Sequence, residues 1–138
     1  MKVTTFVLLA LFGFFIVTST IYYFSQISEK YSEASNSETL NSIAAKVAGL
    51  VIIADETSRE INYSGEPPVN ITFYLPKKVG TENYEVKIDG SRINAVSSNG
   101  LSYASASLPY SVTSSGFIDS RSNSHFIAVN SSGYIIYM

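Results

Sequence analysis

Hydrophobic side chains dominate the first part of the chain. No Asp, Glu, Lys or Arg occurs from Val3 to Ser28, and the centre of this run, Phe6–Val17, is almost entirely apolar. An α-helix needs about 20 apolar residues to cross the hydrocarbon core of a bilayer. Tyr22 and Tyr23 follow the run, and tyrosine favours the boundary between membrane and water. The pattern therefore predicts a transmembrane anchor helix over residues 1–28.

Charge next to this run predicts its orientation. Lys2 and the amino terminus carry positive charge, which places the N-terminus in the cytoplasm and the rest of a single-pass protein outside the cell membrane. A cleaved secretory signal is the alternative: Lys2 would be its basic region and Val17–Ser19 its small-residue cleavage pattern. That reading gives a secreted β domain. Both interpretations carry the remainder of the chain across a membrane.

A helical period continues beyond the membrane segment. The residues Ser35-Asn-Ser-Glu38 match a capping box, so a helix either restarts there or runs through without a break. Steps of three and four then define one apolar stripe, with Lys46 and Asp55 off it. We expect an amphipathic stalk helix over residues 29–58, with any joint at Ser32–Ser37. The stripe consists of Leu40, Ile43, Val47, Leu50 and Ala54.

An apolar stripe above a membrane must pack against something. One alternative is that it packs on the chain's own C-terminal domain. The other is helix–helix association, in which the same five residues pack on the helix of neighbouring copies. The two alternatives do not exclude each other, so the stripe is both a candidate core element and a candidate association surface.

The pattern changes to a period of two after residue 58. Residues 69–75 alternate strictly between apolar and other positions, and Pro67-Pro68 and Pro76 limit this strand. Tyr84–Ile88 and Ser91–Ala95 flank Asp89-Gly90, a pair that favours a type I′ hairpin turn. This turn would place Ile88 opposite Ser91, Val86 opposite Ile93, and Lys87 opposite Arg92.

Further short strands complete a small antiparallel β-sandwich over residues 59–138, which makes the fold class α+β. A hairpin through Asn130–Gly133 joins the last two strands. The expected strands in addition to those above are Glu60–Tyr63, Leu101–Ser107, a segment near Ser111-Val112, Phe117-Ile118, His125–Val129 and Tyr134–Tyr137.

Composition narrows the range of functions. The 138 residues contain 9 Lys and Arg against 11 Asp and Glu, a net charge of -2 that argues against a nucleic-acid partner. The chain has no cysteine and one histidine, so we expect no thiolate metal site, no cofactor and no Cys nucleophile. Asp119, Ser120 and His125 lack a nucleophile-elbow pattern, and we therefore expect no enzyme activity.

Three Asn-X-Ser/Thr triplets begin at Asn62, Asn70 and Asn130. In the orientation expected above, all three lie outside the cell, where they are candidate N-glycosylation acceptors. Asn70 lies on the polar side of its strand and Asn130 lies in a turn. The protein is accordingly a candidate glycoprotein.

A family resemblance rests on the order of these parts. The stretch from Ser42-Ile-Ala-Ala-Lys-Val47 to Ile53, then Asn70–Pro76, Val79-Gly80, and Tyr84–Ile88 with Gly90, resembles small archaeal type IV pilin-like proteins, including archaellins and archaellum accessory subunits. The resemblance implies a non-enzymatic structural or assembly component of an archaeal surface filament. It also implies self-association, or association with other pilin-like subunits, through the N-terminal helix.

The beginning of the chain departs from the usual pilin pattern. Such pilins carry a basic segment and a Gly or Ala processing site before the apolar run, and a glutamate just after it. Here Lys2 leads directly into Val3, and the first acidic residue is Glu29. We therefore expect an unprocessed pilin-like protein that stays in the lipid bilayer. The rival expectation is a single-pass surface module that binds an envelope polymer or a partner protein.

Overall fold

A computed structural model describes residues 2–61, 69–130 and 132–138. The chain divides into two compact units, Met1–Ala34 and Ser35–Met138, and each is described by itself below. Helix α1 (Lys2–Ile61) supplies the first unit and the beginning of the second. All strands belong to the second unit. The fold is α+β, as the sequence predicts.

Helix α1 has 60 residues and no break at Ser32–Ser37. The capping-box residues lie inside the helix. The carbonyl of Ser35 also accepts a hydrogen bond from Thr39 Oγ1 at 3.0 Å. No proline occurs before Pro67 to interrupt the backbone hydrogen bonds. The expected strand Glu60–Tyr63 is wrong for its first half, because helical hydrogen bonding continues through Ile61. Its remaining residues, Asn62 and Tyr63, lie outside the described residues.

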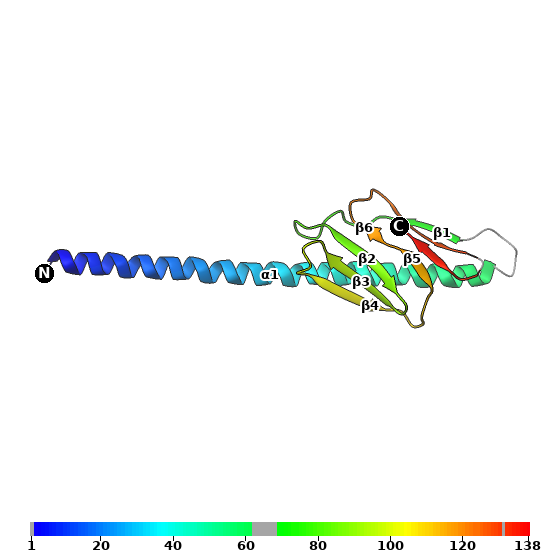
Figure 1. Cartoon of the computed structure of the whole chain (residues 1–138), viewed down its shortest axis with the longest axis horizontal. Coiled ribbons are helices and arrows are strands. Elements are labelled where there is room, and N and C mark those ends of the chain that lie inside the picture. Colours follow the sequence, from blue (N-terminus) through cyan, green and yellow to red (C-terminus); the bar gives the residue numbers. More distant parts are fainter. Residues whose placement is uncertain (1, 62–68, 131) are drawn as a thin grey trace. The chain divides into compact units, whose positions relative to one another are not determined.

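Within the described residues, eight strands form two four-stranded sheets, with the orders β1-β7-β8-β5 and β4-β3-β2-β6. Figure 1 shows β2, β3 and β4 side by side. The described pairs are antiparallel except β5 with β8, which is parallel, so the expected antiparallel arrangement holds for most of the two sheets. The predicted hairpin between β7 and β8 is confirmed. The strands are β1 (Val69–Phe73), β2 (Tyr84–Asp89), β3 (Arg92–Ser97), β4 (Tyr103–Ser107), β5 (Ser114–Gly116), β6 (Ile118–Asp119), β7 (His125–Val129) and β8 (Ile135–Tyr137).

Two of the expected strands lie elsewhere along the chain. The segment near Ser111-Val112 is not a strand, and β5 begins two residues later at Ser114. The backbone of Val112 instead donates to the carbonyl of Gly90 at 3.0 Å, which holds this segment against the β2–β3 turn. Phe117 precedes β6 and is itself exposed, so the sixth strand is Ile118–Asp119.

The β2–β3 hairpin forms in a register different from the predicted one. Ile88 pairs with Ile93 and Asp89 with Arg92, so the two loop residues are Gly90 and Ser91. Gly90 has a φ of 58°, and no residue other than glycine has a positive φ in the described chain. A type I′ turn at Asp89-Gly90 would need a positive φ at Asp89, whereas a type II′ turn needs it only at a glycine in the first loop position.

Charge favours the same register. The predicted pairing would set Lys87 opposite Arg92, and the observed pairing sets Lys87 opposite Asn94 and Arg92 opposite Asp89. Like charges directly opposite each other are destabilising, and opposite charges are favourable. Because the register differs by two residues, each side chain keeps its face of the sheet, and the predicted core residues of both strands are buried.

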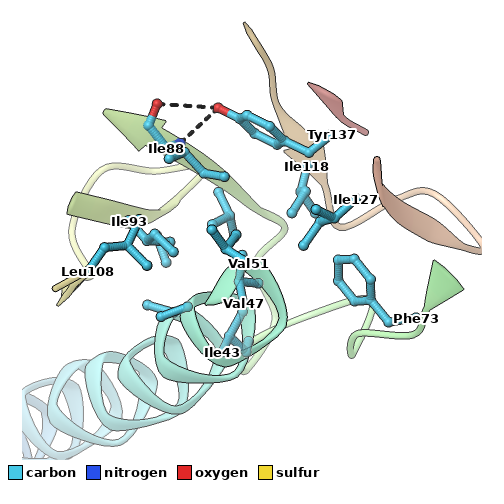
Figure 2. Packing of buried hydrophobic residues seen from close by; sticks show 14 of the residues in the cluster. Ile43, Val47, Val51, Phe73, Ile88, Ile93, Leu108, Ile118, Ile127 and Tyr137 are labelled. Atoms are coloured by element: carbon cyan, nitrogen blue, oxygen red, sulfur yellow. Dashed lines mark hydrogen bonds between the residues drawn. The ribbon is translucent and has the colours of Figure 1, made fainter. Parts of the chain in front are cut away.

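The core of the second unit contains helix α1 as well as both sheets. Figure 2 shows Val47 and Val51 of the helix pointing towards Ile118 and Ile88 of the strands. The first alternative for the apolar stripe is therefore observed: it packs on the chain's own C-terminal domain. Four of the five stripe residues are buried, and Leu50 is half-buried; the buried ones are Leu40, Ile43, Val47 and Ala54.

Tyr137 links the two sheets at the end of β2. Strand β6 pairs with β2 only at Glu85 and Val86, so no strand of the described residues pairs with the backbone of Ile88 on that side. The Tyr137 hydroxyl takes this place: it accepts from the Ile88 amide at 2.8 Å and lies 3.4 Å from the Ile88 carbonyl (Figure 2). A side chain of one sheet thus completes the hydrogen bonding of the other.

Replacing Tyr137 by phenylalanine should lower the free energy of unfolding by about 1–3 kcal/mol, because the buried Ile88 amide loses its acceptor while the ring stays in place. Chemical denaturation of the full chain measures the loss, and faster hydrogen exchange at the Ile88 amide locates it. Tyr74→Phe is the matched control, since Tyr74 is 69% exposed. Equal stability of the Tyr137 and Tyr74 variants would contradict the role of this hydroxyl.

Candidate functional site

The apolar side chains of the first unit are exposed along their whole length. Every large hydrophobic residue from Val3 to Phe24 is at least 50% exposed, and Val3 reaches 76%. The most apolar 18-residue window of helix α1 is not buried at all within the chain. By length and composition this helix is able to cross a membrane.

Two threonine hydroxyls within this segment are satisfied by the helix itself. Thr18 Oγ1 donates to the carbonyl of Phe14 at 2.9 Å, and Thr20 Oγ1 donates to the carbonyl of Ile16 at 2.8 Å. Because these bonds give each hydroxyl a partner in the preceding turn, the hydroxyl does not require a hydrogen bond to water. Thr18 and Thr20 are therefore compatible with a lipid environment, where no water is present to replace an intramolecular partner.

The predicted association stripe offers little free surface. Leu40, Val47 and Ala54 are fully buried and Ile43 is 4% exposed, all against the sheets of the same chain. A neighbouring helix cannot reach these side chains while the second unit is folded. On this unit, the helix residue that exposes the most apolar surface is Ile53, at 54%.

The three candidate glycosylation acceptors differ in their surroundings. Asn70 is exposed on β1, on the side of the strand away from the buried Phe73. Asn130 is half-buried, and its Oδ1 accepts from the backbone amides of Ser132 and Tyr134 at 3.0 and 2.9 Å. Asn62 lies outside the described residues. Asn70 is thus the more accessible acceptor of the two that the structure describes.

Asp119, Ser120 and His125 do not form a hydrogen-bonded triad. Ser120 is fully buried, and its Oγ accepts from the backbone amide of Tyr84 at 2.9 Å. Asp119 pairs with Arg121, whose guanidinium holds the pKa of that carboxyl at about 2. Neither ring nitrogen of His125 has a partner among the described residues. The hydrogen bond through which a histidine activates a serine is therefore missing.

His125 should make the stability of the second unit depend on pH. Its side chain is 1% exposed and packs on the Phe73 ring, and burial lowers its pKa below 6.5 although Asp119 opposes this shift. In the unfolded chain the His125 imidazole binds a proton near pH 6.5, whereas in the folded chain it is still neutral at that pH. We expect full stability above pH 6.5 and a decreasing free energy of unfolding as the pH falls below it.

Chemical denaturation at pH values between 7.5 and 5 measures this dependence. Within this window His125→Leu should remove the slope that the buried imidazole contributes, because no titrating group remains at the position. Asp119 titrates near pH 2, below the window, and does not obscure the comparison. Identical slopes for the wild type and the variant would contradict a neutral, buried His125.

The structure brings together a groove of mixed polar and apolar lining that the sequence does not predict. It lies on the outer face of the β2–β3–β4 sheet, where Glu85, Lys87, Asn94 and Tyr103 point away from the core, and strand β5 also lines it. Its volume is about 600 Å³. The alternation of β2, β3 and β4 predicts that these side chains point outward. It does not predict a groove, because the position of β5 beside them follows from the sheet topology.

A second polar cluster lies at the end of helix α1. Asp55 is 5% exposed and Arg59 lies 3.0 Å from its Oδ2, while the Arg59 guanidinium lies 5.4 Å from the centre of the Tyr110 ring. Burial and the neighbouring Asp55 carboxylate raise the pKa of Tyr110 to about 12. The three side chains hold the last turns of the helix against the segment before β5.

Comparison with known proteins found no matching family model, no matching curated relative and no matching solved structure. Function has to be inferred from the residues of this chain.

Proposed function

We propose that the protein is a non-enzymatic, membrane-anchored cell-surface protein, a pilin-like structural or assembly component of an archaeal surface filament. The apolar segment of helix α1 is its anchor, the N-terminus is cytoplasmic, and the β-sandwich lies outside. The observation that carries the proposal is the exposure of the large apolar side chains from Val3 to Phe24, each of which is at least 50% exposed. Exposing each of these side chains to water costs free energy, whereas contact with lipid or with a neighbouring helix does not.

Association between copies would use this exposed segment. The stripe from Leu40 to Ala54 is occupied by the chain's own sheets, so it is not available for association in the folded protein. In a bilayer or in a fibre core, the side chains between Phe6 and Ile27 are free to pack on those of another copy. Self-association, or association with other pilin-like subunits, is therefore proposed for residues 6–27.

Membrane fractionation of the full chain tests the anchor. The wild type should stay with the membranes at alkaline pH, and the double variant Leu8→Asp, Phe15→Asp should not. Each aspartate at the centre of a spanning helix costs about 3 kcal/mol of insertion free energy. The control Ile53→Asp, Ile136→Asp places the same charges on exposed positions of the second unit and should stay in the membrane fraction. A wild-type chain that is soluble without detergent would overturn the proposal.

A cysteine scan tests the association. Because the chain has no cysteine, single substitutions from Phe6 to Ile27 give unambiguous disulfide crosslinks in native membranes. A filament or assembly component should crosslink at positions spaced by three and four residues, which is one face of a helix. Uniformly absent crosslinks would indicate a lone anchored protein instead.

The groove on the β2–β3–β4 face favours a second candidate function. In that case the protein is a single-pass surface module for an envelope polymer or a partner protein, with the same anchor. Sequencing the N-terminus of the native protein separates both candidates from a secreted β domain, since signal cleavage near Val17–Ser19 would remove most of the apolar segment.

A further inference from the structure

We infer that the groove on the outer face of β2, β3 and β4 binds a neutral glycan. This inference deepens the second candidate function, and it does not depend on the membrane anchor. The groove has a volume of about 600 Å³, within the range of small-molecule sites. All the residues that line it belong to the described part of the second unit.

The side chains of the groove match the two kinds of surface that a sugar presents. A pyranose ring has an apolar face of C–H groups and an edge of hydroxyl groups. Tyr103 is 54% exposed and pairs across the sheet with Val96, so the two present an apolar platform. Beside it lie an amide, Asn94, and an ion pair, Glu85 with Lys87 at 3.3 Å, which supply donors and acceptors for hydroxyls.

Contacts within the groove hold these groups before any ligand binds. The Tyr103 hydroxyl donates to Asn94 Oδ1 at 2.8 Å, which fixes the ring and leaves the amide hydrogens of Asn94 for another acceptor. Both residues stand on paired strands, and β3 has a partner on each side. Because rigid side chains lose little conformational freedom on binding, this arrangement lowers the cost of binding a ligand in the groove.

Charge and backbone pairing argue against other occupants. The charged residues in the lining are Glu85, Asp89 and Lys87, a slightly negative set that disfavours a polyanion. An extended peptide is usually recognised by adding a strand to a free sheet edge. The floor of this groove is the side-chain face of β2 and β3, where the backbone groups of β3 are already paired with β2 and β4. The edge strand β5 also lines the groove, but it has only three residues and offers a short edge for strand addition.

NMR titration of the isotope-labelled full chain, in a detergent without a sugar head group, tests the inference. The probes are maltotriose, mannotriose and the trimer of N-acetylglucosamine. We expect at least one of them to give saturable shifts of the Asn94 side-chain amide and of Val96 and Tyr103. Tyr103→Ala and Asn94→Ala should each weaken this binding by about fivefold or more.

The control variant is Tyr74→Ala, which removes a tyrosine that is 69% exposed and lies outside the groove, and it should bind as the wild type does. The inference is overturned if no trisaccharide gives saturable shifts, or if the Tyr103 and Asn94 variants bind unchanged. It is equally overturned if the same residues shift only with protein concentration, which would indicate a second copy, or only with dextran sulfate, which would indicate a polyanion. None of these results bears on the membrane proposal, because membrane fractionation tests the anchor helix and the NMR titration tests the β-sandwich.

Discussion

Replacing Val47 by glutamate should unfold the second unit. Val47 is fully buried between helix α1 and the two sheets, so the new carboxylate would lie in the core without a partner. We expect the free energy of unfolding to fall by about 4 kcal/mol or more, which is comparable to the whole stability of a small domain. Loss of the tyrosine signals in near-ultraviolet circular dichroism of the full chain measures the result.

Ile53→Glu is the matched control for this substitution. It also changes a β-branched residue of the same helix to glutamate, but Ile53 is 54% exposed and its new charge stays in water. Its cost should be below about 1 kcal/mol. A folded Val47→Glu variant would contradict the core position of the stripe and would return it to the role of an association surface.

Replacing Gly116 by alanine should separate β5 from β8. Gly116 has a φ of 126°, where residues with a side chain are strained, and an added Cβ would overlap the backbone carbonyl of Tyr137. The obstacle is backbone within the parallel pair itself, so it cannot move without breaking the pairing. We expect a loss of about 3 kcal/mol or more in the free energy of unfolding, measured by chemical denaturation.

Gly100→Ala isolates the effect of the backbone angle. Gly100 also has a positive φ, 72°, but nothing lies within 4 Å of the position that a Cβ would take. The cost there should be only the conformational penalty of about 1 kcal/mol. If both alanine variants lose the same stability, the close approach of β5 and β8 is not what requires a glycine at residue 116.

Periodicity predicts much of this fold. The steps of three and four between Leu40 and Ala54 and the alternation in residues 84–88 each follow from one face being buried, and the structure buries those faces. The turn type was harder to predict, because Asp89-Gly90 and Gly90-Ser91 both satisfy the local pattern and both keep the apolar side chains on one face. The positive φ of Gly90 and the charges of Lys87 and Arg92 favour the turn at Gly90-Ser91.

Contacts between distant segments set the limit of such reasoning. Asp55 lies off the apolar stripe and yet is buried, because the segment carrying Tyr110 folds over the end of the helix. The groove beside Tyr103 likewise needs β5, whose position follows from a parallel pairing that no local pattern indicates. Sequence periods report which face of an element is covered, and they do not report which remote segment covers it.

The position of β8 within its sheet has a consequence for biogenesis. In the order β1-β7-β8-β5, strand β8 lies between β7 and β5, and among the described residues β5 has no other strand partner. During synthesis from the N-terminus, β5 therefore stays unpaired until β8 has left the ribosome. A chain truncated before Ile135 would lack the strand that pairs with β5.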